Sequence, residues 1–353
     1  MSGVFRSVVR LPAPRANVSL VVLACALLAQ PVAAAAAPTP PETTQMAPSA
    51  TEQELAAVLV TGEQPGPGLW RVTSHGNELW ILGTLTPLPA GMQWRATQAE
   101  AVIARSRQML APPSVSINIG LFKSLTLIPA LLRARKSPDG KQLQELLPPA
   151  LYARWRSLKD RYMPNSDAVE KHRPIVAAQE LYTKALEKSG LKSGDEIWQR
   201  VQQAAKKHDV AVVPVTVSPT LKDPKETIQQ LQQIALQREV DCFTATLDRI
   251  EKDLPSMQQR ANQWSTGDVA ALRAMPQSDQ RVTCFDSVAS VPSLREQLHK
   301  TRDQINDLWV AAAQTALANS PTTFAVLPMD QILQPTGLLA RLKARGYEVQ
   351  EPR

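Results

Sequence analysis

The sequence predicts a mixed α/β (α+β) fold in which strands from both ends of the chain form one sheet around a large helical insert. Apolar and β-branched segments typical of strands occur near the start of the body, at 69–82, and again near its end, at 322–350. The sequence between them has mostly helical periodicity and is punctuated by proline. We therefore expect a two-layer α/β or α+β domain with its sheet built from distant parts of the chain.

The expected strands begin with a hairpin, in which Leu69–Thr73 and Leu79–Leu82 flank a turn at 74–77. The next strand is broken by a pair of prolines, and a later β-branched segment reads as a buried strand despite an internal proline. These later strands, together with the two that close the chain, are Gln108–Ile117, Val210–Val217, Thr322–Leu327 and Tyr347–Gln350.

The expected helices carry apolar residues at helical spacing and begin or end near proline or glycine. One long helix follows Pro224 as far as Ile250, and a second runs from about Leu294 to Ala318. The shorter ones are Thr97–Ser106, Leu143–Leu147, Ala150–Tyr162, Ile175–Ser189, Gln259–Trp264, Gly267–Met275 and Gly337–Ala344, the last with Gly346 as its C-cap.

The N-terminus has the pattern of a secretory signal peptide. Three arginines precede an apolar segment at 18–29, and Ala33–Ala37 offers several small-residue cleavage frames. The apolar segment is shorter than a membrane-spanning helix requires. We predict that residues 1–37 are a signal peptide and that the protein is exported, to the periplasm or outside the cell. The alternatives are a retained anchor and lipid attachment at Cys25, which the short apolar run before Cys25 disfavours.

The rest of the chain divides into a linker and one domain. Residues 38–68 are rich in Pro, Thr, Ala and Gly and predict a flexible linker, and 69–353 is long enough for a single domain with a large core. Removing residues 1–37 takes three positive charges from a formal net charge of +7, which leaves +4. No basic block with interleaved aromatic residues occurs, so nucleic-acid binding is not expected. No later apolar run is long enough to span a membrane.

Few residues have the pattern of an active site. The four histidines are not at ligand-like spacing, and we expect each to be a solvated surface group: His75, His172, His208 and His299. The sequence has no Gly-x-Ser-x-Gly elbow, no Walker loop and no Gly-x-Gly-x-x-Gly.

The segment Gly83–Thr86 and the hairpin before it resemble the opening of the TraB/GumN family, whose usual form is Gly-Thr-x-His. The resemblance extends from about Leu69 to Val349. It is carried further by Trp264–Asp268, which is similar to a Trp-x-x-Gly-Asp turn, and by Asn306, Trp309, Phe324–Val326, Gly337–Leu339 and Arg345–Val349.

The resemblance implies metal-dependent peptide hydrolysis, as in the TIKI branch of the family, which needs about three protein ligands and an activated water. The positions that would supply those ligands depart from the family pattern. The first histidine is replaced by Thr86, and a second is replaced by Gln331, beside Asp330. The expected acidic residues fall at neutral positions near Ala111–Pro113 and Val215–Val217, and the expected arginine is Ile305.

The preferred hypothesis is therefore a non-catalytic family member, without a metal or other cofactor, that serves as a binding, scaffold or regulatory protein. Thr86, Asp330 and Gln331 are its ligand-pocket candidates, and the family name alone suggests an envelope or exopolysaccharide-assembly partner. One alternative is an active hydrolase that uses these three residues and further acidic groups. Another is a haem- or ligand-binding module, for which no His or Cys is clearly placed.

Two cysteines remain after the signal peptide, Cys242 and Cys284. An exported protein enters an oxidising compartment, so we predict a disulfide between them. We place Cys284 in the connection that precedes the last long helix. The alternative is a pair of separately buried thiols.

Overall fold

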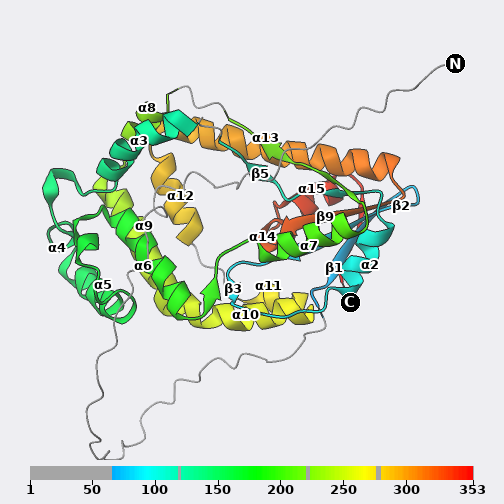
Figure 1. Cartoon of the computed structure of the whole chain (residues 1–353), viewed down its shortest axis with the longest axis horizontal. Coiled ribbons are helices and arrows are strands. Elements are labelled where there is room, and N and C mark those ends of the chain that lie inside the picture. The colour runs from blue at the N-terminus through cyan, green and yellow to red at the C-terminus, as the bar shows by residue number, and fades with distance from the viewer. Residues whose placement is uncertain (1–65, 118–120, 220–222, 276–279, 353) are drawn as a thin grey trace, which may run out of the picture.

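The structure is a computed structural model, which describes residues 66–117, 121–219, 223–275 and 280–352 (Figure 1). The predicted signal peptide, with Cys25, and nearly all of the predicted linker lie outside the described residues. In the described part, no helix combines the length and the apolar character needed to cross a membrane.

A six-stranded mixed sheet joins the two ends of the chain, as the sequence predicts. Its strand order is β10-β1-β2-β9-β4-β7. Strands β2, β9, β4 and β7 run parallel to one another, whereas β1 is antiparallel to both β2 and β10. The six strands are β1 (Leu69–Ser74), β2 (Asn77–Thr84), β4 (Gln108–Leu110), β7 (Ala211–Val213), β9 (Thr322–Pro328) and β10 (Glu348–Gln350).

The predicted hairpin of β1 and β2 is present and is closed by a two-residue turn. His75 and Gly76 occupy it with φ angles of 49° and 84°. Two successive positive φ angles give a turn whose twist matches that of the paired strands, and glycine at the second position adopts it without strain.

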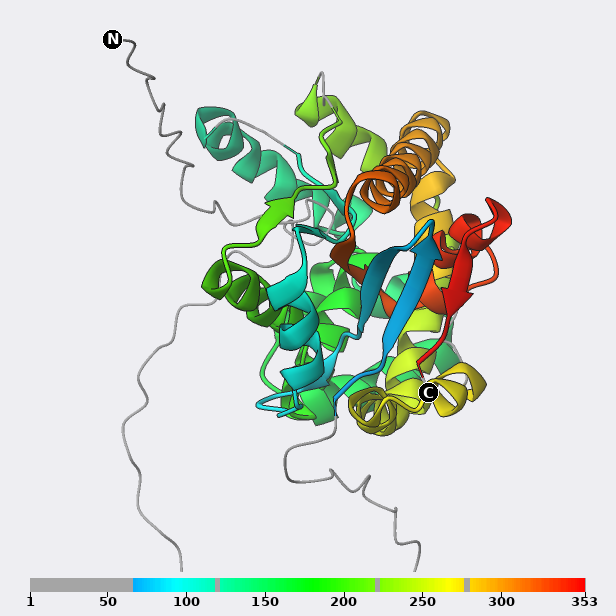
Figure 2. The same ribbon diagram turned by 90° about the vertical axis from the view of Figure 1, so that its right-hand side faces the viewer.

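Strand β9 lies at the centre of the sheet and is buried on both faces. Every residue from Thr323 to Leu327 has no exposed surface. Helices α2 (Thr97–Arg105) and α7 (Glu196–Lys207) cover one face, and α13 (Pro292–Asn319) and α15 (Leu338–Ala344) cover the other (Figure 2). The domain thus has three layers rather than two, which explains why β9 reads as a continuous apolar run.

The predicted strand Val210–Val217 is wrong in two respects. It is divided at Pro214 into β7 and β8 (Thr216–Val217), and β7 is an edge strand whose Val212 is 39% exposed. Proline lacks the N–H that would continue the hydrogen-bonding ladder, so the strand is divided at Pro214. The break at Pro112-Pro113 is confirmed: β5 (Ser114–Val115) follows it and pairs with β8.

The sequence between β4 and β9 is mostly helical, as predicted, but two helices differ from the expectation. The long helix after Pro224 is interrupted at 232–235, and its second half continues through a π-helical turn, η3, into α10. Cys284 lies on a helix, not in an irregular connection. The helical elements are α3 (Leu121–Ala134), η1 (Pro138–Gly140), α4 (Leu143–Leu146), α5 (Pro149–Tyr162), η2 (Asp167–Lys171), α6 (Pro174–Lys188), α8 (Pro224–Leu231), α9 (Leu236–Asp248), η3 (Arg249–Asp253), α10 (Leu254–Thr266), α11 (Val269–Ala274), α12 (Gln280–Ala289) and α14 (Met329–Leu333).

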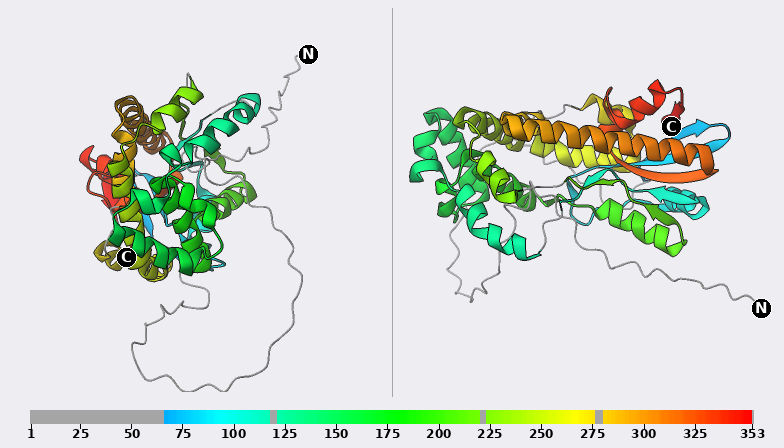
Figure 3. Two further views of the ribbon diagram at one scale, coloured as in Figure 1. Left: turned by 90° about the vertical axis from the view of Figure 1, so that its left-hand side faces the viewer. Right: turned by 90° about the horizontal axis from the view of Figure 1, so that it is seen from above.

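Two large apolar clusters form the interior, one around the sheet and one among the helices. Helix α10 belongs to both, because Leu254 and Met257 pack in the helical cluster while Ala261 and Trp264 pack in the sheet cluster. Helix α13 extends from the sheet along the length of the molecule (Figure 3). That residues 69–353 act as one domain stays a prediction.

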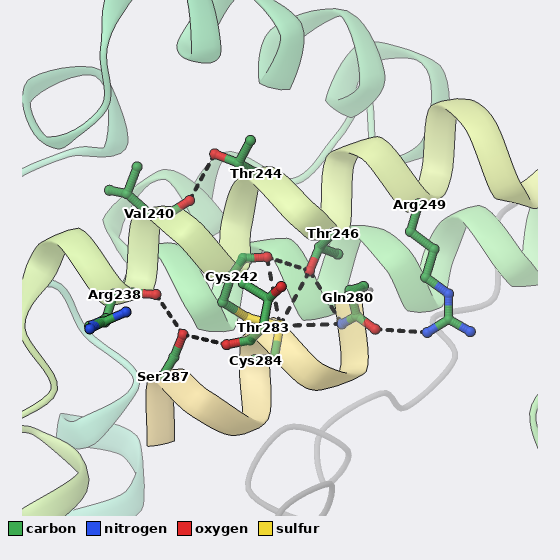
Figure 4. Close-up of a disulfide and its surroundings, with 10 residues drawn as sticks. All are labelled: Arg238, Val240, Cys242, Thr244, Thr246, Arg249, Gln280, Thr283, Cys284 and Ser287. Atoms are coloured by element: carbon green, nitrogen blue, oxygen red, sulfur yellow. Dashed lines mark hydrogen bonds between the residues drawn. A yellow bond between two sulfur atoms is a disulfide. The ribbon is translucent and has the colours of Figure 1, made fainter. Parts of the chain in front are cut away.

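The predicted disulfide between Cys242 and Cys284 is confirmed in the structure and connects α9 to α12 (Figure 4). The two Cα atoms are 4.6 Å apart. Polar contacts accompany the bond: Ser287 donates a hydrogen bond to the Arg238 carbonyl at 2.7 Å, again from α12 to α9. These links to α9, together with the packing of Phe285 against His299 of α13, hold α12 in place.

Loss of the disulfide should destabilise the protein. The bond closes a loop of 42 residues, for which the chain-entropy model gives about 4 kcal/mol, less any strain. We expect reduced wild-type protein and an oxidised Cys242→Ala/Cys284→Ala variant to unfold at similar urea concentrations, both well below that of the oxidised wild type. An unchanged midpoint on reduction would contradict a stabilising bond.

Candidate functional site

The candidate site lies at the carboxyl edge of the sheet. Strands β2, β9, β4 and β7 are parallel, so their C-terminal ends meet at this edge, where ligands commonly bind in sheets of this kind. Thr84 and Pro328 are directly paired at the ends of β2 and β9. Thr86 and Asp330 each follow two residues later, so the structure places them at neighbouring strand ends.

The three predicted pocket residues differ in exposure. Thr86 is exposed and precedes a cis peptide bond to Pro87, whereas Asp330 and Gln331 are half-buried in the first turn of α14. That all three side chains contact one ligand stays a prediction.

Asp330 is the acidic residue at this edge, and its carboxylate has two partners. Its Oδ1 accepts a hydrogen bond from the Gln331 backbone N–H at 3.0 Å, and its Oδ2 lies 3.1 Å from Arg281 Nη2. The Arg281 side chain is 66% exposed, so the ion pair contributes little to stability. It nevertheless places a positive charge next to the carboxylate that a metal ion would need. Arg281 was not among the predicted site residues, because its helix, α12, was not predicted.

The other two strand ends carry no acidic side chain. Strand β4 continues into Ala111-Pro112-Pro113, and β7 into Pro214-Val215. The Ala111 N–H donates to the Val213 carbonyl at 3.0 Å, and the Ser114 N–H donates to the Val215 carbonyl at 3.0 Å. These backbone groups therefore continue the hydrogen bonding between the two chain segments beyond the ends of β4 and β7.

The residues at the edge do not fit a zinc-type site. Such a site needs about three His, Cys or carboxylate ligands, and the strand ends supply one carboxylate, already paired with Arg281. Across the described ranges, no group of three His, Cys, Asp or Glu side chains is arranged to hold a metal ion.

Below the edge, two motifs of the sequence contact each other directly. Trp264 Nε1 donates a hydrogen bond to the Gly83 carbonyl at 2.8 Å, and both residues are buried. Space is limited at Gly83: a Cβ at this position would lie 2.2 Å from Met329 Sδ and 3.2 Å from the Trp70 ring. The motif glycine therefore lets β2 and α14 approach each other closely beneath the candidate site.

The Trp264–Asp268 motif also forms a helix-to-helix turn, as the resemblance implies. Gly267 ends α10 with a φ of 76°, a left-handed conformation that favours glycine. Asp268 begins α11 by accepting a hydrogen bond from the Ala271 N–H at 2.9 Å.

A second charged cluster joins α6, η3, α10 and α12, and its Gln280 is the sequence neighbour of Arg281. The Arg249 guanidinium lies 4.7 Å from the Tyr182 ring centre and donates to Gln280 Oε1 at 2.7 Å. Arg260 pairs with Asp253 at 2.7 Å. Burial lowers the pKa of Arg249 and raises that of Tyr182. These contacts join the helices, although the buried Arg249 Nε has no hydrogen-bond partner among the described residues.

Two of the four histidines follow the surface expectation, whereas His172 and His299 are half-buried. His75 lies in the exposed hairpin turn, and His208 is an exposed C-cap of α7. His172 is half-buried instead, with its Nδ1 3.3 Å from Glu180 Oε1. His299 contacts Arg302 at 3.0 Å.

The chain belongs to the TraB/PrgY/gumN family, whose model matches residues 68–351. This match confirms the resemblance identified from the motifs, and it spans both the sheet and the helical insert. Comparisons with curated proteins and with solved structures give no match. The position at which the resemblance implies an arginine, Ile305, packs in the sheet core beside Trp309.

Gly337→Ala should displace the Gln331 segment. A Cβ at residue 337 would lie 2.4 Å from the Gln331 carbonyl oxygen, and this backbone atom cannot move aside as a flexible side chain could. We expect a loss of about 1–3 kcal/mol in unfolding free energy, measured by urea denaturation. Gly194→Ala is the matched control, because the nearest atom to its added Cβ is 4.0 Å away. Equal stability of the two variants would contradict this packing.

Proposed function

We propose that this protein is an exported, non-catalytic member of the TraB/PrgY/gumN family that binds a ligand or partner at the carboxyl edge of its sheet. In this proposal Thr86 and Gln331 offer polar groups to the ligand, and Arg281 with Asp330 provides a charge pair beside them. An envelope or polysaccharide-assembly partner rests on the family name alone.

The charge balance at the edge is the main support for the proposal. Hydrolysis by the family's implied mechanism needs a metal ion that activates water, and that ion must be held by ligands able to donate electron pairs. The four strand ends bear Thr86, a proline-rich segment, a proline–valine segment and Asp330. The one carboxylate among them faces the Arg281 guanidinium at 3.1 Å. A cation already next to that carboxylate opposes the binding of a second one.

The alternative is a hydrolase that uses Thr86, Asp330 and Gln331 without the family's ligand set. A nucleophilic threonine requires an adjacent general base to take its proton. Among the described residues, the Asp330 carboxylate contacts the Gln331 N–H and Arg281, and no hydrogen bond joins it to Thr86. The geometry therefore favours binding over catalysis.

Elemental analysis tests the proposal most directly. Protein purified without chelators should contain zinc, manganese and iron far below one ion per chain. The Asp330→Asn variant should have the same metal content as the wild type, because Asp330 is not a ligand in this proposal. One ion per chain that is lost in Asp330→Asn would instead indicate a working metal site and support the hydrolase.

Export is proposed from the N-terminal sequence and has its own test. The mass of the protein recovered from the periplasm or medium should correspond to cleavage between Ala33 and Ala37, because the small-residue frames fall there. A chain that retains residues 1–37, or one that carries lipid on Cys25, would refute this part of the proposal.

A further inference from the structure

A basic pocket lies in the helical part of the molecule, away from the carboxyl edge of the sheet. It has a volume of about 530 Å³, within the usual range for small-molecule sites. Helices α3 and α8 and the segment before η1 form its walls, and these helices lie at the opposite end of the molecule from the sheet (Figures 1 and 3). Its lining is Ala130, Arg133, Lys136, Ser137, Pro138, Arg173, Lys225, Ile228, Gln229 and Gln232.

The charged residues that line the pocket are all of one sign. Four of its lining residues are basic, and none is acidic. Arg173 forms an ion pair with Glu239. The other three basic residues have no such partner among the described residues. In the part of the chain that the structure describes, no carboxylate is within ion-pair distance of Arg133, Lys136 or Lys225.

Two neighbouring basic groups pair with a carboxylate outside the pocket lining. Arg133, Lys136 and Lys225 are therefore the basic residues available to a ligand. Arg135 and His172, beside Lys136 and Arg173 in sequence, both contact Glu180. Burial acts to raise the pKa of Glu180, but its hydrogen bond and charge interactions with His172 and Arg135 outweigh burial and lower it. Glu180 is thus held as a carboxylate that balances these two groups.

Arg173, which lines the pocket, joins the segments around it through hydrogen bonds. Arg173 is 8% exposed and donates hydrogen bonds to the Gln232 and Ile234 carbonyls, each at 3.2 Å, as well as to Glu239. These contacts join the start of α6 to the segment between α8 and α9. Ser137 and Ile228 are also buried, so the basic side chains extend from a well-packed part of the molecule.

We infer that this pocket binds the phosphate group of a small phosphorylated molecule. Three cations that share one cavity repel one another, and an anion placed between them relieves that repulsion. A phosphate monoester carries a charge of about −1.5 to −2 at neutral pH, which suits several cations better than a single carboxylate does. Arginine and lysine both bind phosphate through charge-assisted hydrogen bonds, and Gln229 and Gln232 add neutral donors at the rim.

Titration calorimetry with inorganic pyrophosphate, at ionic strength matched with sodium chloride, tests the inference. The exported protein should bind it, and Lys136→Gln/Lys225→Gln should weaken binding by about tenfold or more, since two charge-assisted contacts are lost. Both lysines are exposed, so the variant should fold normally, as circular dichroism can verify. Lys206→Gln is the matched control: it removes an exposed lysine at the end of α7 and should bind like the wild type.

The same phosphate chemistry occurs in free metabolites and in lipid headgroups, and a sedimentation assay separates the two. Wild-type protein that sediments with vesicles containing phosphatidic acid, which carries a monoester phosphate, but not with phosphatidylcholine vesicles, and loses this in Lys136→Gln/Lys225→Gln, would identify a headgroup. Pyrophosphate binding without sedimentation would identify a free phosphorylated compound. The inference is overturned if the wild type binds neither probe, or if the double variant binds as tightly as the wild type. Either result is independent of metal content at the sheet edge.

Discussion

The hydrogen bond from Trp264 to the Gly83 carbonyl is the contact on which the arrangement of the two halves depends. It joins α10, the helix shared by both apolar clusters, to β2 of the sheet, and both of its partners are buried. Trp264 also packs edge-on against Trp94, with ring centres 5.5 Å apart. A buried indole N–H without a partner is costly, so the sheet and the helical insert must meet in this register. The absence of a side chain at Gly83 leaves room for α14.

The carboxyl edge of the sheet begins next to this contact, because β2 ends at Thr84, and its charged groups come from α14 and α12. Thr86 continues from β2, and Asp330 begins just after β9. Arg281 reaches Asp330 from α12, which the Cys242–Cys284 bond holds on α9. The chain belongs to the family by sequence, and the described carboxylate at this edge pairs with a cation. Family membership alone does not define the function, because function depends on site groups rather than on the fold.

The helical insert has polar chemistry of its own. The Arg173–Glu239 pair is buried, and burial raises the pKa of Glu239 against the lowering effect of Arg173. Such a pair contributes little net stability, but loss of one partner would leave an uncompensated charge. It fixes the start of α6 against α9. The nearby Arg133, Lys136 and Lys225 side chains are exposed to solvent and line the same pocket as Arg173.

Local patterns in the chain were enough to predict the hairpin, the closing strands, the helical insert, the family and the cysteine pairing. Each follows from local chemistry: alternating apolar residues, proline and glycine breaks, motif spacing, and an even pair of cysteines after the predicted signal peptide. The edge position of β7 and the interruption of the helix at 232–235 could be read from the three-dimensional packing alone. The tertiary structure also showed that Arg281 reaches Asp330. Strand order, helix breaks and ion pairs between distant residues depend on which surfaces pack together, and no local pattern in the chain encodes that packing.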